Sequence, residues 1–572
     1  MLVANRTPEP RLSASTHRET DMMNYCQRRL SAALAATSLL AGVATLKAAP
    51  ARPNIVLILA DDLGYSDFGC FGSEISTPNI DQLAKDGVAF TQFYNQARCC
   101  PTRAALMTGR YQHQVGIGEM IDAYAAAARK AANSPAYQDH LSTNSPTMAE
   151  LLRKAGYRTL MAGKWHLGKR PEEWPGHRGF DRSFVQINGA MNYFGGNSGN
   201  GPRDPMALDD QPYMPPHDGF YTTDAFTDHA IGFVEDAVTN HAQQPFFLYL
   251  AYNASHWPLQ APESDVQKYY GKYDQGWQHI RVERLEKMQE LGIVPPDQAM
   301  APMDRGMAKP WDKLTPEQRK QWARRMEVFA AQTEHLDREI GRLMGEIKRL
   351  GVDSNTLVIC LSDNGGAAED PNGGNHEAPI GDRDSFRGYA RPWATVSNTP
   401  WWLHKTTAYE GGISTALLAR WPAGIPAGKD GAYVREPADV MDLMPTFLDL
   451  AGAQYPTNGA VKPEGHSILP MIKGEPSDPN RLFCWEHEGN RAIRDGHWKL
   501  VALPNKTEWE LFDISHDRIE SHDVAAEHPD VVARLNQEYD DWATRAGVIP
   551  FNKIKETIRA NRDATPPKLE DK

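Results

Sequence analysis

The stretch NIVLILADD, residues 54–62, is an uninterrupted apolar run of strand length that ends in two aspartates. A short apolar run bounded by a turn is typical of a strand buried on both faces, as in a parallel sheet. Three further runs share this form and also end in polar residues: YRTLMA (157–162) before GKWH (163–166), PFFLYLAYN (245–253) before His256, and TLVICLS (356–362) before Asp363 and Asn364. The four runs together predict strands of one parallel sheet.

Helical patterns separate the expected strands. Thr147 and Glu150 have the spacing of a capping box before LLRKAG, and residues 330–350 have helical apolar spacing just before the strand at 356. The alternation predicts an α/β fold with a large, mostly parallel central sheet flanked by helices. Because ligands bind beyond the carboxyl ends of parallel strands, the polar residues that follow the runs should converge on one edge.

The pattern of the chain changes after about residue 470. RAIRDGHWKLVAL contains an Asp-Gly hairpin signal, EWELFDI follows as a strand, and DVVARLNQEYDDWATRAG has the pattern of a helix. These signals predict a small antiparallel sheet with a helix packed on it. We therefore divide the chain into an N-terminal extension with a signal peptide (1–49), a large domain that carries the polar clusters (50–470) and a smaller C-terminal α+β domain (471–572).

The composition is that of a globular protein with an excess of acidic residues. The chain has 572 residues, 41% of them hydrophobic, and a formal net charge of −12. Nucleic-acid binding needs a basic face, so this charge argues against a nucleic-acid partner. An anionic substrate would have to be held by a local cluster of cations or by a metal.

The N-terminus has the layout of a secretory signal peptide. Arg28 and Arg29 precede an uncharged, weakly apolar run at 30–46, which small residues follow. A retained membrane anchor is the alternative because the run approaches spanning length, but its Ala, Ser and Thr content favours cleavage. We expect a periplasmic or secreted protein with its signal within residues 22–49 and no stable membrane anchor.

Two polar pairs suit a divalent cation. Asp61 and Asp62 follow one expected strand, and Asp363 and Asn364 follow another. Three carboxylates and an amide oxygen form the oxygen-rich set that Ca²⁺ or Mg²⁺ prefers. Residues of these types are also common in turns, but two such pairs at equivalent strand ends favour the metal interpretation.

Cations and imidazoles are expected at the same edge. Lys164 and His166 follow one strand, and His256 follows another. A lysine could bind substrate oxygens, and the imidazoles could transfer protons. Either histidine alone is more often a packed or surface residue than a catalytic one.

Residues 97–110, ARCCPTRAALMTGR, place two cysteines side by side in a chain that has few. With Cys26 in the signal, five of the six cysteines remain, and an odd number in an exported protein leaves at least one sulfur unpaired or chemically altered. Cys99 and Cys100 stand before Pro101 and an expected short helix. Residue 99 would therefore lie near a helix N-terminus, where negative charge is favoured.

C-x-P-x-R followed by A-A-L-M-T-G, here residues 99–109, resembles the signature of type I sulfatases. The resemblance spans nearly all of residues 54–550 through NIVLILADDLG, GKWHLG, ASHWP, SDNGG, KTTAYEGG, RDGHWKL and WELFDI. It implies the alkaline phosphatase/sulfatase-like fold and the hydrolysis of sulfate monoesters. It also implies that a formylglycine-generating enzyme oxidises Cys99 to formylglycine; a vicinal disulfide or two inert thiols are the rival interpretations.

The resemblance further implies a divalent cation, Ca²⁺ in preference to Mg²⁺. Its ligands would come from the matched motifs: Asp61, Asp62, Asp363, Asn364 and an oxygen of the modified Cys99. Asp363 could also accept a proton from the attacking hydroxyl.

The matched motifs also imply the catalytic roles. Hydrated formylglycine would be the nucleophile, and Arg103 would steady it. Lys164 and Lys405 would bind sulfate oxygens, His256 would protonate the leaving group, and His166 would take the proton of the second hydroxyl.

Two rival functions remain beside a sulfatase that acts on aryl sulfates or sulfated carbohydrates. One is a phosphoryl or phosphonate ester hydrolase of the same superfamily, and the other is a non-catalytic homologue that binds sulfated glycans. Four features could line a specificity pocket or could equally be packing residues and turns: Trp401, Trp402, and the segments 192–200 and 485–489.

Overall fold

The computed structural model of the chain describes most residues from 52 to 563. The described ranges are 52–196, 204–303, 309–371, 373–375, 377–456, 462–476, 481–504 and 506–563. The expected signal peptide, and residues 197–200 of the segment 192–200, lie outside them. Residues 53–572 form one compact unit.

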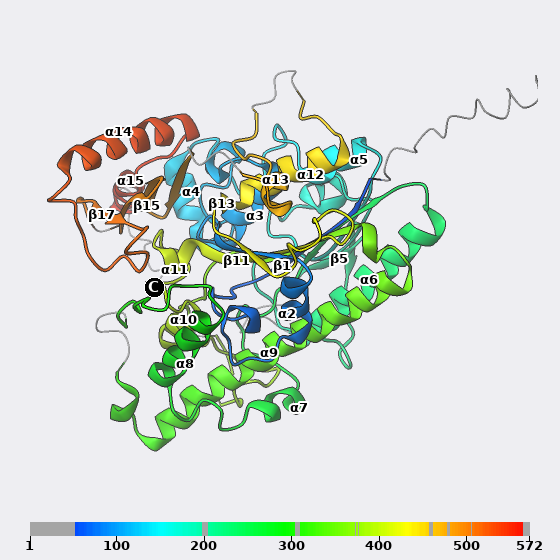
Figure 1. Cartoon of the computed structure of the whole chain (residues 1–572), viewed down its shortest axis with the longest axis horizontal. Coiled ribbons are helices and arrows are strands. Elements are labelled where there is room, and N and C mark those ends of the chain that lie inside the picture. The colour runs from blue at the N-terminus through cyan, green and yellow to red at the C-terminus, as the bar shows by residue number, and fades with distance from the viewer. Residues whose placement is uncertain are drawn as a thin grey trace, which may run out of the picture. The chain divides into compact units, whose positions relative to one another are not determined.

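An eleven-stranded mixed sheet forms the centre of this unit (Figure 1). Its order is β12-β2-β11-β8-β1-β7-β3-β4-β5-β6, and β13 pairs with β2. The strands are β1 (Asn54–Ala60), β2 (Val88–Tyr94), β3 (Arg158–Lys164), β4 (Arg182–Gln186), β5 (Met206–Leu208), β6 (Gln211–Tyr213), β7 (Phe246–Ala251), β8 (Thr356–Ser362), β11 (Ser414–Arg420), β12 (Ala432–Val434) and β13 (Ala438–Asp439). The two short strands β9 (Gly373–Gly374) and β10 (Ser385–Phe386) form a separate pair.

The four apolar runs of the sequence are neighbours in the sheet, as predicted. β8, β1, β7 and β3 lie side by side and run parallel. Their near-continuous burial explains why they lack the polar alternation of a half-exposed strand. The sheet is mixed because β11 runs antiparallel to both β8 and β2, and β5 and β6 extend the far edge antiparallel.

Helices cover both faces of the sheet. Successive side chains of β1 point to opposite faces of the sheet and so pack in two separate apolar clusters. Ile55, Leu57 and Leu59 belong to one cluster, and Val56 and Ile58 belong to the other. α3 (Cys99–Thr108), α5 (Met148–Lys154) and α12 (Leu443–Ala451) contribute to the first cluster. α6 (Thr222–Asn240) and α9 (Pro316–Arg349) contribute to the second, and Figure 1 shows these two helices together on the side of the sheet away from α3 and α12.

The remaining helices are shorter or lie nearer the surface. They are α2 (Pro78–Lys85), α4 (Ala126–Ala132), α7 (Glu263–Val266), α8 (Trp277–Glu290), α10 (Ala390–Ser397), α11 (Glu410–Ile413), α13 (Leu469–Ile472), α14 (Pro529–Ala546) and α15 (Phe551–Asp563). The expected capping box is present at the start of α5, where the Thr147 side chain accepts from the Glu150 backbone N–H at 3.1 Å.

A four-stranded antiparallel sheet forms the C-terminal part. Its strands follow the order of the chain: β14 (Leu482–His487), β15 (Asn490–Asp495), β16 (Trp498–Ala502) and β17 (Glu510–Asp513). The predicted Asp-Gly turn joins β15 to β16, and α14 packs on the sheet through Leu535, Ile493 and Leu500. The domain boundary near residue 470 stays a prediction.

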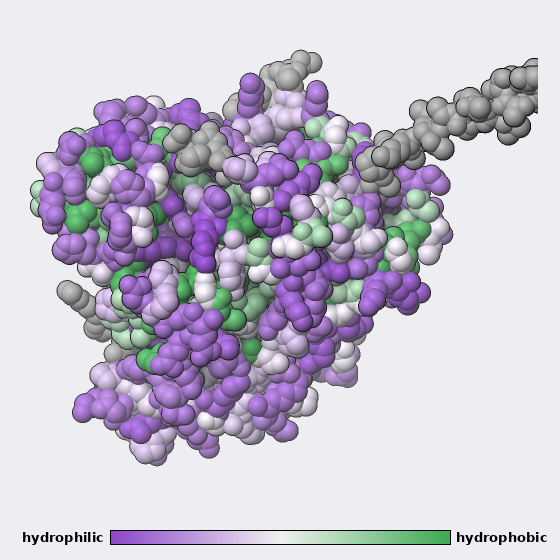
Figure 2. Space-filling view, viewed as in Figure 1, coloured by the Kyte–Doolittle hydropathy of each residue, from purple (hydrophilic) through white to green (hydrophobic). Residues whose placement is uncertain are grey.

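Polar side chains dominate the face shown in Figure 2, where apolar residues form small scattered groups. Within the part of the chain that the structure describes, no helix has both the length and the apolar character needed to cross a bilayer.

Candidate active site

The carboxyl ends of β1 and β8 bring the two expected polar pairs together. The parallel register pairs Ala60 with Ser362, so the residues that follow each strand are neighbours. Asn364 Nδ2 donates to Asp62 Oδ1 at 2.6 Å, and the Asp62 backbone N–H approaches Asp363 Oδ1 at 3.4 Å. Both pairs are buried. The predicted convergence of these side chains is therefore present in the structure.

Residue 99 is the first residue of α3, and every residue of this helix is buried. All cysteines in the described residues are free thiols, so Cys99 and Cys100 form no vicinal disulfide. The Cys100 sulfur lies 3.3 Å from the sulfur of Met120, in apolar surroundings. The structure has an unmodified cysteine at position 99, and its thiol occupies the place that a formylglycine side chain would take.

Three buried cations pair with the acids. Lys164 Nζ lies 2.5 Å from Asp61 Oδ2, and Lys405 Nζ lies 2.7 Å from Asp62 Oδ1. Arg103 donates to Asp363 Oδ2 from Nε at 3.0 Å and from Nη2 at 2.8 Å. A buried charge is costly unless it is paired, and here each carboxylate has its own cation.

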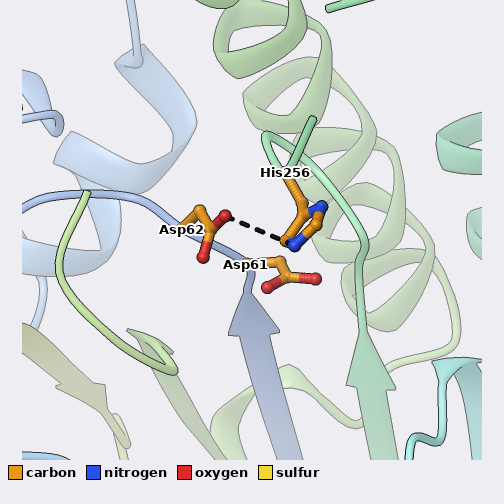
Figure 3. Close-up of side chains that lie close together, drawn as sticks. All are labelled: Asp61, Asp62 and His256. Atoms are coloured by element: carbon orange, nitrogen blue, oxygen red, sulfur yellow. Dashed lines mark ion pairs between the residues drawn. The ribbon is translucent and has the colours of Figure 1, made fainter. Parts of the chain in front are cut away.

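His256 approaches the same carboxylates from the segment after β7. Its Nε2 lies 3.5 Å from Asp62 Oδ2, and Figure 3 shows the ring directed at Asp61 and Asp62. Nδ1 lies 2.6 Å from the Trp257 carbonyl oxygen, to which it donates. Burial, together with the charges of Lys405 and Lys164, lowers the pKa of His256 well below its usual range.

His166 lies close to Cys99 and pairs with an acid that the sequence did not single out. Its Nε2 is 2.9 Å from Asp122 Oδ2. Burial disfavours the imidazolium, but the charges of Asp122 and Cys99 outweigh burial and raise the pKa of His166. Asp122 lies in a loop with no strand-end pattern, so no sequence signal marked it.

The surroundings of residue 99 favour an anion. Burial disfavours a thiolate there, but Lys164, His166 and Lys405 outweigh it and lower the pKa of Cys99 to about 6. This positive environment is the local cluster of cations that an anionic substrate requires in an acidic protein.

A second pair of residues missed by the sequence analysis borders this cluster. Arg98 Nη1 lies 3.0 Å from Glu369 Oε1, and Lys405 Nζ lies 3.6 Å from Glu369 Oε2. Burial alone would raise the pKa of Glu369, but Lys405 and Arg98 hold it below its usual range. Glu369 lies in a loop after β8, where periodicity gives no signal.

The oxygen atoms at the strand ends fit a divalent cation. Asp61 Oδ1 and Asn364 Oδ1 are buried acceptors without a hydrogen-bond partner. One ligand atom each from Asp61, Asp62 and His256 lies within 4.8 Å of the others. Burial and the neighbouring Asp363 raise the pKa of Asp61 well above its usual range, and a bound cation relieves such crowding of negative charge.

Comparison with known proteins identifies the family. Residues 53–453 match the Sulfatase family, and residues 400–544 match the family described as N-sulphoglucosamine sulphohydrolase, C-terminal. This chain belongs to the sulfatase family. It is therefore an enzyme that hydrolyses sulfate esters, and the family implies both formylglycine and a metal.

Relatives of the sulfatase cover most of its length. It is 36% identical over 546 residues to an uncharacterized sulfatase of Schizosaccharomyces pombe, covering 89% of this chain and 96% of the relative. It is 35% identical over 439 residues to an arylsulfatase of Klebsiella aerogenes, covering 74% and 90%. The crystal structure of Ps i-CgsB in complex with k-i-k-neocarrahexaose matches with a TM-score of 0.65 and 29% identity, covering 90% of this chain and 98% of that one.

The side chains suggested for a specificity pocket are mostly packing residues. Trp401 is buried, with its ring 5.3 Å from that of Tyr65, and Trp485 is buried beside Tyr94. Trp402 packs edge-on against Tyr409.

Proposed function

We propose that this sulfatase acts through the formylglycine form of Cys99 beside a Ca²⁺ ion held by the acids at the ends of β1 and β8. The observation that supports this most directly is the position of residue 99. It begins α3, and the charges of Lys164, His166 and Lys405 all act on it. A helix N-terminus and three cations stabilise negative charge on a nucleophile and on a sulfate group.

Asp61, Asp62, Asp363 and Asn364 would hold the cation, since their oxygens are buried and two of them lack partners. When bound, the cation and the hydrated formylglycine supply an oriented hydroxyl for attack on sulfur and a second hydroxyl whose deprotonation releases sulfate. Side chains of the protein would bind the sulfate group and transfer the protons.

The lysines neutralise the substrate. A sulfate monoester repels nucleophiles because its oxygens are negatively charged, so catalysis requires that this charge be balanced. Lys164 is buried beside Asp61 and Lys405 beside Asp62, and both would bind these oxygens. Arg103 pairs with Asp363 and would steady the nucleophile as well as the acid.

The two histidines move protons. His256 donates from Nδ1 to the Trp257 carbonyl, which directs Nε2 toward the site. A bound sulfate ester would offset the charges of Lys405 and Lys164 that lower the pKa of His256, so that Nε2 would carry a proton and give it to the leaving oxygen. His166 is oriented by Asp122 and would take the proton of the second hydroxyl. The two imidazoles thus serve successive steps.

The substrate would be an aryl sulfate or a sulfated carbohydrate. The arylsulfatase relative supports the first class, and the resemblance to Ps i-CgsB, whose structure holds a neocarrahexaose, supports the second. Measuring sulfate release from nitrophenyl sulfate and from defined sulfated saccharides, including carrageenan oligosaccharides, would decide between the classes.

The chain would be exported, its signal peptide would be cleaved, and its Cys99 would be oxidised to formylglycine. The layout of residues 22–49 supports a cleaved signal peptide and a periplasmic or secreted enzyme, and a formylglycine-generating enzyme is the required partner. The mass of the mature N-terminus of secreted protein tests the cleavage.

The central test compares nitrophenyl esters of sulfate, phosphate and phosphonate on enzyme co-expressed with the maturing enzyme. We expect sulfate to have the highest kcat/KM and Cys99→Ser to lose its turnover. A preference for phosphate or phosphonate would contradict the proposed substrate class, and full turnover by Cys99→Ser would contradict the proposed nucleophile.

A further inference from the structure

A second cluster of ligand-type side chains lies apart from the acids of β1 and β8. Glu119 comes from the loop before α4, and His487 and Glu488 come from the end of β14 and the turn to β15. Glu119 and His487 are 3% and 1% exposed, and Glu488 is half-buried. One ligand atom of each residue lies within 4.8 Å of the others.

His487 is the unusual member of this cluster. Both of its ring nitrogens are buried and neither has a hydrogen-bond partner. The oxygen Glu488 Oε1 lies 3.9 Å from Nε2, beyond hydrogen-bond distance. Burying an imidazole whose nitrogens have no hydrogen-bond partner costs free energy, so an arrangement of this kind calls for an occupant.

The carboxylates of the cluster are also without cations. Among the described residues, no lysine or arginine forms an ion pair with Glu119 or Glu488; Arg98, the cation whose charge acts on Glu488, pairs with Glu369 instead. The neighbouring Glu486 differs, because His113 Nε2 lies 2.8 Å from its Oε2 and the Gly489 N–H donates to its Oε1. The Met120 N–H donates to Glu119 Oε1 at 2.8 Å, and the Glu119 and Glu488 carboxyl groups hydrogen-bond to each other. The two carboxyl groups of the cluster therefore have hydrogen bonds but no cation.

We propose that Glu119, His487 and Glu488 form a second metal site, which takes Zn²⁺. One imidazole and two carboxylates are a ligand set that Zn²⁺ commonly accepts, whereas Ca²⁺ prefers oxygen atoms alone. Around a tetrahedral Zn²⁺, ligands at about 2.1 Å from the ion lie about 3.4 Å from one another, so the side chains need to close by up to about 1.4 Å. A water molecule or the second oxygen of a carboxylate completes the coordination.

The ion would connect the loop that carries Asp122 to the C-terminal sheet. Glu119 stands three residues before Asp122, which pairs with His166, while His487 and Glu488 belong to the C-terminal sheet. Zn²⁺ at this site would fix the loop that carries Asp122 against the β14–β15 turn. Its role is positional, since none of the three ligands belongs to the acid and lysine cluster around residue 99.

The test is zinc binding by the full-length mature enzyme. The protein is stripped with a chelator, supplied with excess Ca²⁺ so that the oxygen-rich site is filled, and titrated with Zn²⁺ by calorimetry, with elemental analysis after dialysis. We expect one equivalent of Zn²⁺ in the wild type and at least tenfold weaker binding in Glu488→Gln. Glu488 is a half-buried turn residue, so this variant should fold. His487→Asn is a second variant that should also weaken Zn²⁺ binding.

Two controls separate the sites. His516→Ala removes an exposed histidine of the same C-terminal part and must leave the Zn²⁺ equivalent unchanged. Asp62→Asn weakens the oxygen-rich site and must also leave it unchanged. The proposal is overturned if Glu488→Gln and His487→Asn bind Zn²⁺ as the wild type does, if Asp62→Asn removes the equivalent, or if the wild type binds none.

Discussion

Arg103 donates two hydrogen bonds to a single oxygen of Asp363, from Nε at 3.0 Å and from Nη2 at 2.8 Å to Oδ2. Its Nη1 donates to the Lys164 carbonyl at 2.9 Å, so this one side chain joins α3 to the ends of β8 and β3. The other oxygen, Oδ1, is left on the side of Asp62. The arginine therefore fixes the orientation of the carboxylate as well as its charge.

We expect Arg103→Lys to lower kcat/KM for nitrophenyl sulfate by about 100-fold. Lysine keeps the charge but cannot reproduce the three directed hydrogen bonds, and small displacements of catalytic groups cost about this much. Arg420→Lys is the matched control, because Arg420 also binds an aspartate, Asp353, with two nitrogens and lies away from the site. A loss below threefold in Arg103→Lys would show that charge alone suffices.

We expect Cys99→Ser to lose sulfate hydrolysis and Cys100→Ser to retain most of it. Serine can attack sulfur but has no second hydroxyl with which to release sulfate, whereas Cys100 packs beside Met120 away from the acids. Mass spectrometry of the wild-type Cys99 peptide should show a loss equal to the difference between CH₂SH and CHO. An unmodified thiol in fully active enzyme would contradict this prediction.

Much of this site could be predicted because the carboxyl ends of parallel strands lie at the same edge of a sheet. Once the runs at 54–60 and 356–362 are parallel neighbours, Asp61 and Asp363 must meet at one edge. Asp122 and Glu369 could not be found, since each lies in a loop where neither periodicity nor spacing marks its partner.

Parts of the fold also lay beyond prediction. α9 begins at Pro316 and not near residue 330; Thr315 and Gln318 form a capping box there that gives a local signal for the earlier start. The position of β11 has no such signal. It lies antiparallel between β2 and β8, and strand order depends on packing between segments distant in the chain.

Removal of divalent cations should abolish activity and lower the melting temperature. Asp61 Oδ1 and Asn364 Oδ1 have no other partners, so the folded state alone binds the ion tightly. Calcium at about 100 times its Kd should add about 2.7 kcal/mol to the free energy of unfolding. Chelation followed by Ca²⁺ or Mg²⁺ addition, with activity and melting curves, tests this; recovery by Mg²⁺ but not Ca²⁺ would contradict the proposed ion.

A histidine far from the site should make stability depend on pH. His335 Nδ1 lies 2.8 Å from Asp265 Oδ2, and Nε2 lies 2.5 Å from Asp224 Oδ1. Burial opposes protonation, but these two carboxylates raise the pKa of His335 despite the nearby Arg338. The folded state thus binds the proton more tightly than the unfolded chain does.

The direction of the pH dependence of stability follows from this difference in proton binding. The stabilisation is fully present below the unfolded pKa of about 6.5 and is lost as pH rises through the higher folded pKa. Urea unfolding of the wild type and of His335→Gln should therefore differ most at about pH 6 and less at about pH 9. A difference that grows with pH would contradict the assignment. His516→Ala, at an exposed position, should show no such trend.

The C-terminal sheet is joined to the segment of Lys405 by a buried ionic network, which yields a final prediction. Lys499 Nζ on β16 lies 2.9 Å from Glu410 Oε1 and 2.8 Å from Glu520 Oε1, and all three side chains are fully buried. Glu410 also accepts from Arg518 Nε at 2.8 Å and begins α11, five residues after Lys405.

Removing one partner of such a network leaves uncompensated buried charge, which costs about 3–5 kcal/mol. We expect Lys499→Met to lower the free energy of unfolding by about this amount. It should also raise KM, because Glu410 at the start of α11 loses its ion pair with the C-terminal sheet and the nearby Lys405 is held less firmly. Glu410 keeps Arg518 as a partner, so Glu520→Gln added to Lys499→Met removes the carboxylate that the first change leaves without a cation and should restore part of the stability. Urea unfolding and nitrophenyl sulfate kinetics measure the two effects separately. Lost stability at unchanged KM would mean that the network supports the fold without positioning Lys405.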